Sequence, residues 1–209
     1  MLLLAFDTAT PAVAVALHDG ETVVAEHTVV DAMRHGELLA PGIATVLERG
    51  GADRTQLTDL AVGVGPGPFT GLRVGLVTAR TLGEVLGIPV HGVCSLDVLA
   101  AGAEVDGPFL VATDARRKEV YWASYADRLT RTAGPHVTRP AEVEAPGPVV
   151  GRGAVLYPDA FPKAVAPEYP SAGILAELVV RGEVEVLPPD PLYLRRPDAV
   201  AATSRKKVL

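Results

Sequence analysis

The chain has 209 residues, of which 48% are hydrophobic and 21% charged, a balance typical of a folded globular protein rather than a disordered one. Its 19 Lys and Arg against 25 Asp and Glu give a net charge of −6, which argues against a protein whose own surface is the main binder of nucleic acid. The single cysteine, Cys94, excludes an intramolecular disulfide and a cysteine zinc cage. With no signal-peptide or membrane-spanning pattern, we expect a cytoplasmic protein.

Three strands open the first half. The apolar runs at 2–6, 12–18 and 22–30 predict three antiparallel strands, with Asp19-Gly20 as a hairpin turn between the last two. The remaining predicted elements of this half are a helix at 35–49, a strand at 60–64, a helix at 71–86 with Thr70 as its N-cap, a strand at 89–93 and a helix capped by Ser95 that runs to Ala103.

A boundary follows at 102–108, so we expect two domains, 1–104 and a smaller 105–209. Strands are predicted at 109–113, 119–125 and 129–132, and a helix from Ser171 to Arg181. The stretch 139–170 is rich in proline and glycine, and it is assigned no regular structure beyond a strand at 149–151. Both halves open with hairpin strands and reach helices, which indicates a duplicated β-β-β-α-β-α plan, degraded in the second copy.

Three segments have the residue types of an anion or metal site. Asp7-Thr8-Ala9-Thr10 follows the first strand and suits phosphate or Mg²⁺ with water, or else a turn that satisfies its own N–H groups. Gly65-Pro66-Gly67-Pro68 precedes a helix, but its prolines remove donors, so a rigid turn is favoured over an anion cradle. Asp114-Ala115-Arg116-Arg117-Lys118 is either a solvated basic turn or an anion site beside a carboxylate.

A stripe of small residues runs along the helix predicted at 71–86. Its members, Gly71, Gly75, Ala79 and Gly83, are spaced by four and share one helical face. Each glycine costs about 0.5–1 kcal/mol relative to alanine inside a helix, so another backbone must come close to this face. Val74, Thr78, Leu82 and Val85 occupy the neighbouring sector and are expected to face the sheet. The residues alone leave open whether the stripe packs inside the chain or against another chain.

Other catalytic signals are missing from the sequence. No two of its five histidines are three to five positions apart, so no helical or finger-type metal pair is present, and there is no Gly-x-Ser-x-Gly elbow. Cys94 lies in an apolar run and is expected to be a buried, inert thiol.

Six stretches together resemble the TsaB (YeaZ) family, the dimerisation subunit of the bacterial machinery for tRNA N6-threonylcarbamoyladenosine. They are FDTAT at 6–10, RHGELLAPGI at 34–43, VGVGPGPFTGLRVGL at 62–76, LGIPVHGVCSLDVLA at 86–100, DARRKEVYWA at 114–123 and PLYLRR at 191–196. The resemblance implies an α/β fold of the ASKHA type, that of actin, hexokinase and Hsp70. It also implies a non-catalytic subunit that binds and activates the paralogous transferase TsaD, which modifies adenosine 37 of tRNAs that read ANN codons.

The resemblance further implies association with the ATPase TsaE, contact with tRNA only through the complex, and a homodimer in isolation. Family members pair through the first two helices, which favours the second interpretation of the glycine stripe. The expected partner interface is therefore Leu39, Ile43, Val46, Leu47, Gly71, Leu72, Gly75, Leu76, Ala79 and Gly83.

The resemblance also bears on catalysis. The two metal-binding histidines of the catalytic paralogue fall on Ser95 and Leu99, and its glycine-rich phosphate loop on Asp114-Ala115-Arg116-Arg117. We therefore expect no catalytic, cofactor-binding or metal-binding residues of this chain's own. The alternative is an independent ASKHA-type ATPase or small-molecule kinase that uses Asp7 and Asp114 around Mg²⁺.

Overall fold

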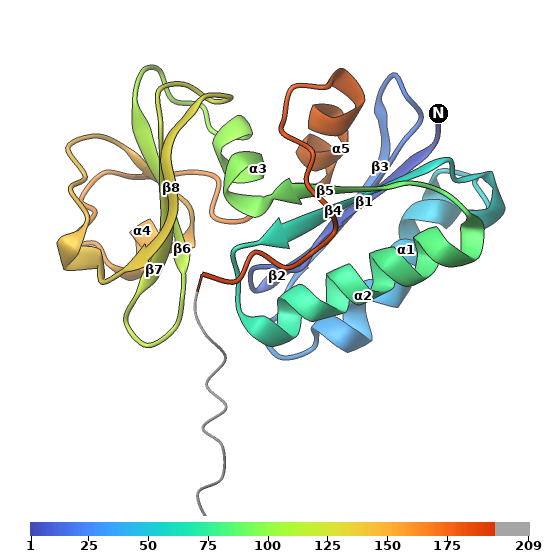
Figure 1. Cartoon of the computed structure of the whole chain (residues 1–209), viewed down its shortest axis with the longest axis horizontal. Helices are drawn as coiled ribbons and strands as arrows, with labels where there is room; N and C mark the ends of the chain where they lie inside the picture. Colours follow the sequence, from blue (N-terminus) through green and yellow to red (C-terminus); the bar gives the residue numbers. More distant parts are fainter. Residues whose placement is uncertain (195–209) are drawn as a thin grey trace, which may run out of the picture.

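The computed structural model describes residues 1–194, which form two five-stranded sheets with helices against them (Figure 1). The first sheet has the order β3-β2-β1-β4-β5, and the second has the order β10-β9-β6-β7-β8. The strands of the first sheet are β1 Leu3–Asp7, β2 Ala12–His18, β3 Val23–Val30, β4 Asp59–Gly65 and β5 Val90–Cys94. Those of the second are β6 Phe109–Asp114, β7 Val120–Tyr125, β8 Arg131–Thr138, β9 Val149–Val150 and β10 Ala164–Val165.

The two sheets repeat one topology. When the second is read from its other edge, β8-β7-β6-β9-β10 matches β3-β2-β1-β4-β5 strand for strand. In each, the first three strands along the chain pair antiparallel, and the last two continue in parallel from the first of them. The duplicated plan and the α/β ASKHA fold expected from the sequence are therefore confirmed.

The copies differ in the helices that join equivalent strands. In the first copy β3 leads to β4 through α1 (His35–Arg49) and the short 3-10 helix η1 (Arg54–Gln56), and β4 leads to β5 through α2 (Phe69–Leu86). In the second copy the same connections shrink to the 3-10 helix η2 (Pro140–Glu142) and to α4 (Arg152–Leu156). Each copy then ends in a helix, α3 (Ser95–Ala101) and α5 (Ala172–Arg181).

Two predicted N-caps are wrong. Helix α2 begins at Phe69 with Pro68 in the N-cap position, so Thr70 lies inside the helix. Helix α3 has Cys94 as its N-cap and no side-chain cap, because the hydroxyl of Ser95 is used elsewhere. Ser171 does cap α5, where its hydroxyl accepts a hydrogen bond from the Ile174 N–H.

The segment 139–170 also departs from expectation. Besides the predicted strand near 149–151 it contains η2, α4 and β10. These elements are only two to five residues long, too short for hydrophobic periodicity to mark them. The long-range pairing of β9 with β6 and β10 fixes them instead.

Helices cover both faces of the first sheet (Figure 1). Leu4 and Phe6 point to the face covered by α1 and α2, while Leu3 and Ala5 point to the face covered by α3 and α5. Helix α5 comes from the second half of the chain, so one face of the first sheet is covered by residues beyond the boundary expected at 104–105. No helix among residues 1–194 is long and apolar enough to cross a membrane.

Candidate functional site

The Asp7 carboxylate is enclosed by the chain's own groups. The Ser95 hydroxyl donates to its Oδ2 at 2.5 Å and the Ala9 N–H donates to its Oδ1 at 2.7 Å. Gly63 lies so close that a Cβ there would overlap the same carboxylate. Asp7 is 1% exposed, and burial raises its pKa, because the charged form loses water. Both oxygens are thus engaged inside the protein, which disfavours the alternative in which Asp7 holds Mg²⁺.

The second carboxylate of that alternative, Asp114, is engaged by its own loop. Its Oδ1 accepts a hydrogen bond from the Arg116 N–H at 2.8 Å, and its Oδ2 lies 3.5 Å from Nη1 of the Arg116 side chain. The Arg116 side chain also lines a cavity of about 260 Å³ whose other walls include Thr8, Thr10 and His35. The loop after β6 therefore lies close to the loop after β1. It places Arg116 there, while Asp114 remains bonded within its own loop.

Ser95 and Leu99, the two positions that the resemblance sets against metal-binding histidines, have structural roles here. Ser95 donates to Asp7 and also accepts from the Gly65 N–H at 3.2 Å. Leu99 is fully buried in the apolar cluster between α3 and the second sheet. Within residues 1–194, no group of three or more His, Cys, Asp or Glu is placed to hold a metal ion.

The glycine stripe of α2 packs against the loop after β1. The Thr8 hydroxyl donates to the Gly71 carbonyl at 2.8 Å and accepts from the Gly75 N–H at 3.1 Å. A Cβ at Gly71 would lie 2.6 Å from the Thr8 carbonyl oxygen, and one at Gly75 would lie 2.5 Å from Thr8 Oγ1. At Gly83 a Cβ would lie 2.5 Å from Val90 Cγ2. The close contacts at these glycines are therefore made by the chain itself, by backbone at Gly71 and by side chains at Gly75 and Gly83.

The residues expected at the partner interface share this inward orientation. The buried ones are Leu39, Val46, Gly71, Leu72, Gly75, Leu76, Ala79 and Gly83, while Ile43 and Leu47 are partly buried against the same core. The spacing of these residues correctly indicated a buried face on each helix. Spacing alone does not show whether that face packs against the same chain or against another one. An interface on these helices must therefore use the residues beside the stripe.

Helix α2 presents an apolar row to solvent on its outer side. Phe69 is 40% exposed, Val77 62% and Val85 75%, with Arg73, Arg80 and Glu84 interspersed. Val85 was expected to face the sheet, and this expectation is wrong because the glycine stripe occupies that sector. We call Phe69, Arg73, Val77, Arg80, Glu84 and Val85 the α2 outer face. Helix α1 lies beside α2 on the same side of the sheet (Figure 1).

The segment before residue 194 is fastened to one end of this face. The Leu192 N–H donates to the Val64 carbonyl at 2.9 Å. The Tyr193 ring stacks on Phe69 with centroids 5.4 Å apart, and Arg73 lies over the Phe69 ring at 3.5 Å while its Nε donates to the Tyr193 hydroxyl at 3.2 Å. This role of the stretch PLYLRR could not be predicted from the sequence, because contacts between residues more than 100 positions apart produce no local sequence pattern. Its last two residues, 195 and 196, lie outside the described residues.

Comparisons with known proteins agree with one another. A family model described as "TsaD: tRNA N6-adenosine threonylcarbamoyltransferase" matches residues 24–182. An uncharacterized protein of Mycobacterium tuberculosis is 47% identical over 203 residues, which cover 94% of this chain and 93% of that protein. The tRNA threonylcarbamoyladenosine biosynthesis protein TsaB of Escherichia coli is 41% identical over 128 residues, or 60% of this chain and 55% of that protein. The solved structure of YeaZ from Pseudomonas aeruginosa has a TM-score of 0.78 at 31% identity and covers 92% of this chain and 99% of its own.

Proposed function

The chain belongs to the TsaB (YeaZ) family of tRNA threonylcarbamoyladenosine biosynthesis proteins, and from this premise we propose that it is a non-catalytic subunit that binds and activates the paralogous transferase TsaD. TsaD would then transfer the threonylcarbamoyl group to N6 of adenosine 37 in tRNAs that read ANN codons. In this proposal the chain contributes a surface rather than a reacting group.

The α2 outer face carries the proposal. Val77 and Val85 are apolar, more than half exposed and eight positions apart, and they lie on one i, i+4 ridge of the helix with Thr81 between them. Burying these side chains against a second apolar helix is favourable by about 25 cal/mol per Å² of apolar surface removed from water. Arg73, Arg80 and Glu84 lie beside them and supply the polar rim typical of a protein interface.

Three features support a non-catalytic role. The Asp7 carboxylate is held by Ser95 and Ala9, and Leu99 stands at one of the two metal positions of the paralogue. The loop after β6 carries arginines where the paralogue has glycines, so the close backbone approach that a tightly bound phosphate needs is absent from that loop.

The remaining assignments follow from the family. We propose that TsaE joins the same assembly, that the chain forms a homodimer through α1 and α2 when TsaD is missing, and that it meets tRNA only within the complex. We place it in the cytoplasm, where tRNA is modified. We also propose residues 1–104 and 105–209 as its two domains, with α5 returning from the second to cover the first sheet.

The test is co-expression of the chain with TsaD of the same organism, followed by affinity capture and a threonylcarbamoylation assay on tRNA. Val77→Lys should reduce the captured TsaD at least tenfold and lower modification in parallel, because a charge would be buried in the contact. Val155→Lys, at a 42% exposed valine on α4, is the matched control and should change neither. Normal capture of TsaD by the Val77→Lys variant would overturn the proposed surface.

A further inference from the structure

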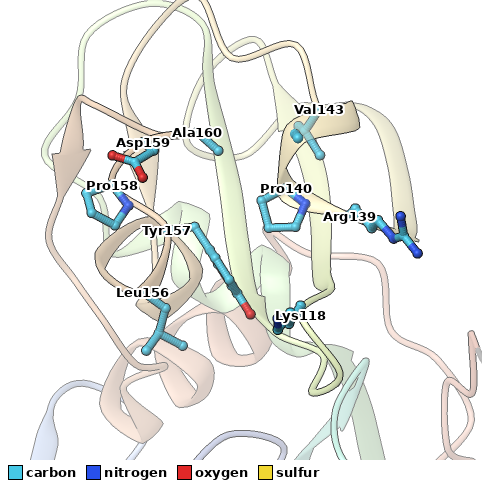
Figure 2. Close-up of a pocket in the computed structure, with 10 residues that line it drawn as sticks. Lys118, Arg139, Pro140, Val143, Leu156, Tyr157, Pro158, Asp159 and Ala160 are labelled. Atoms are coloured by element: carbon cyan, nitrogen blue, oxygen red, sulfur yellow. The ribbon is translucent and has the colours of Figure 1, made fainter.

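A cavity of about 620 Å³ opens on the second sheet, where the two copies of the fold differ most. It is lined by η2 and its flanking residues on one side and by the residues that end and follow α4 on the other (Figure 2). In the first sheet the equivalent connections are the long helices α1 and α2, which fill this position. Their reduction to a few residues leaves the hollow, and its volume lies within the range of roughly 300–1,000 Å³ typical of small-molecule sites.

The walls of the cavity form a slot for a flat group. The Tyr157 ring stands in the middle of the hollow, with Pro140 facing it from the other side and Leu156 and Val143 at its ends (Figure 2). Pro140 is buried and Tyr157 is half-buried, so both are held in place while part of the Tyr157 ring remains accessible. A planar ring inserted here would stack on one aromatic face and contact a rigid pyrrolidine with the other.

The charges at the cavity favour an anion. Lys118 and Arg139 line it together with a single carboxylate, Asp159, and the Arg139 guanidinium points away from Tyr157 (Figure 2). Within residues 1–194 neither cation forms an ion pair with a carboxylate, whereas Arg116 and Arg152 of the same part of the fold both do. Partial desolvation, with the charge of Asp114, raises the pKa of Tyr157, so its hydroxyl remains a donor.

The backbone that positions Lys118 is strained. Arg116, Arg117 and Lys118 follow one another with φ of 62°, 53° and 61°, the left-handed region that costs a residue with a Cβ about 1 kcal/mol. Glycine would adopt these angles without that cost. Strain of this kind persists where the side chains are needed, and here it directs Lys118 into one cavity and Arg116 into another.

We propose that this cavity binds a nucleoside monophosphate unit, with the base between Tyr157 and Pro140 and the phosphate near Lys118. Base stacking on an aromatic ring and charge-assisted contacts to phosphate oxygens are the two interactions that recognise such a unit. A free nucleotide and a nucleotide of single-stranded RNA present the same chemistry. The inference does not use the α2 outer face.

The test is a titration of the full chain, followed in ¹H–¹⁵N NMR spectra, with AMP, a single-stranded oligoadenylate and inorganic phosphate. AMP should shift the amides around Lys118, 139–143 and 156–160 and leave the α2 outer face unchanged. Lys118→Gln and Tyr157→Leu should each weaken AMP about tenfold, while Tyr157→Phe keeps the stack and should retain most of the affinity. Lys163→Gln, at an exposed lysine outside the cavity lining, is the matched control.

Comparing oligoadenylate with AMP distinguishes a free nucleotide from single-stranded RNA as the ligand. Oligoadenylate that binds at least tenfold more tightly than AMP assigns the site to RNA, and oligoadenylate that binds no better than AMP assigns it to free nucleotides. Phosphate alone binding as well as AMP, shifts that miss the cavity, or equal effects of Lys118→Gln and Lys163→Gln would each overturn the inference. The Val77→Lys variant should bind AMP normally, so failure of the TsaD surface is distinguishable from failure of this site.

Discussion

The Ser95 hydroxyl donates a hydrogen bond to the Asp7 carboxylate at 2.5 Å, and both residues are 1% exposed. The bond joins the end of β1 to the first residue of α3 across 88 positions of the chain. A buried carboxylate is costly when charged, and this hydroxyl, together with the Ala9 N–H, replaces part of the lost hydration. Burial is the largest influence on Asp7 and raises its pKa above the ordinary value of 3.8.

The raised pKa of Asp7 predicts a pH-dependent stability that Asp7→Asn should remove. The folded chain binds this proton more tightly than the unfolded chain, so between 3.8 and the raised folded value the free energy of unfolding falls as the pH rises. Asparagine has nearly the same shape and does not titrate. The difference in unfolding free energy, variant minus wild type, should therefore grow with pH. Urea denaturation between about pH 4 and pH 7 measures it, and a difference independent of pH would contradict the shift.

Gly75→Ala should destabilise the chain rather than only impair partner binding. A Cβ at this position would lie 2.5 Å from Thr8 Oγ1, the atom that accepts the Gly75 N–H. Overpacking of a rigid contact costs about 1–3 kcal/mol of unfolding free energy, which urea denaturation resolves. Thr8→Ala removes the clashing oxygen, so the double variant should recover part of the loss relative to the sum of the single variants.

Gly36→Ala is the matched control for that experiment. Gly36 lies in the first turn of α1, where an added Cβ would meet nothing within 4 Å. Alanine there should leave stability unchanged or raise it by about 0.5–1 kcal/mol, because it lowers the entropy lost on folding. Equal destabilisation by Gly75→Ala and Gly36→Ala would show that contact with Thr8 does not set the cost at Gly75.

The first copy of the fold follows from local signals. Helix α1 spans the predicted 35–49, and β2 spans the predicted 12–18, because hydrophobic periodicity and turn residues mark each of them. The second copy is harder to predict, because α4 and β10 are too short to show a hydrophobic periodicity and are fixed by contacts between residues distant in sequence. The local pattern also favours Thr70 as the N-cap of α2, whereas the helix begins two residues earlier, with Pro68 in the N-cap position.

The candidate site could be predicted only in part, because the sequence does not show which group contacts the glycine stripe. The stripe of Gly71, Gly75 and Gly83 indicates a close approach to this face, and the nearest atoms to an added Cβ are the Thr8 carbonyl oxygen, Thr8 Oγ1 and Val90 Cγ2, in that order. Only the first of these is a backbone atom. Sequence spacing is identical whether the approaching group belongs to the same chain or to a second chain. Only the placement of Thr8 against α2 distinguishes them, and it depends on a pairing 63 to 67 positions apart.

Tyr193→Ala should loosen the segment that crosses the N-terminal end of α2. The change removes the ring that stacks on Phe69 and accepts from Arg73. In a double-variant cycle with Phe69→Ala, the coupling should be about 0.5–1 kcal/mol, the lower part of the range for aromatic pairs, because both rings are partly exposed. Tyr193→Phe keeps the stack and should retain most of this coupling. A coupling near zero would mean that the two rings do not stabilise one another in solution.

Cys94 should be inert in the folded chain at mildly alkaline pH. Burial, followed by the negative charge of Asp97, raises the pKa of the Cys94 thiol to about 12, so at pH 8 only about one thiol in 10⁴ is ionised. A disulfide reagent that reacts with thiolates should therefore modify the native protein only as fast as the chain opens, and the guanidinium-unfolded protein at once. Met33→Cys in a Cys94→Ala background places a thiol at an 88% exposed position and supplies the fast reference rate. Native Cys94 reacting as rapidly as that reference would show that the thiol is neither buried nor suppressed by its surroundings.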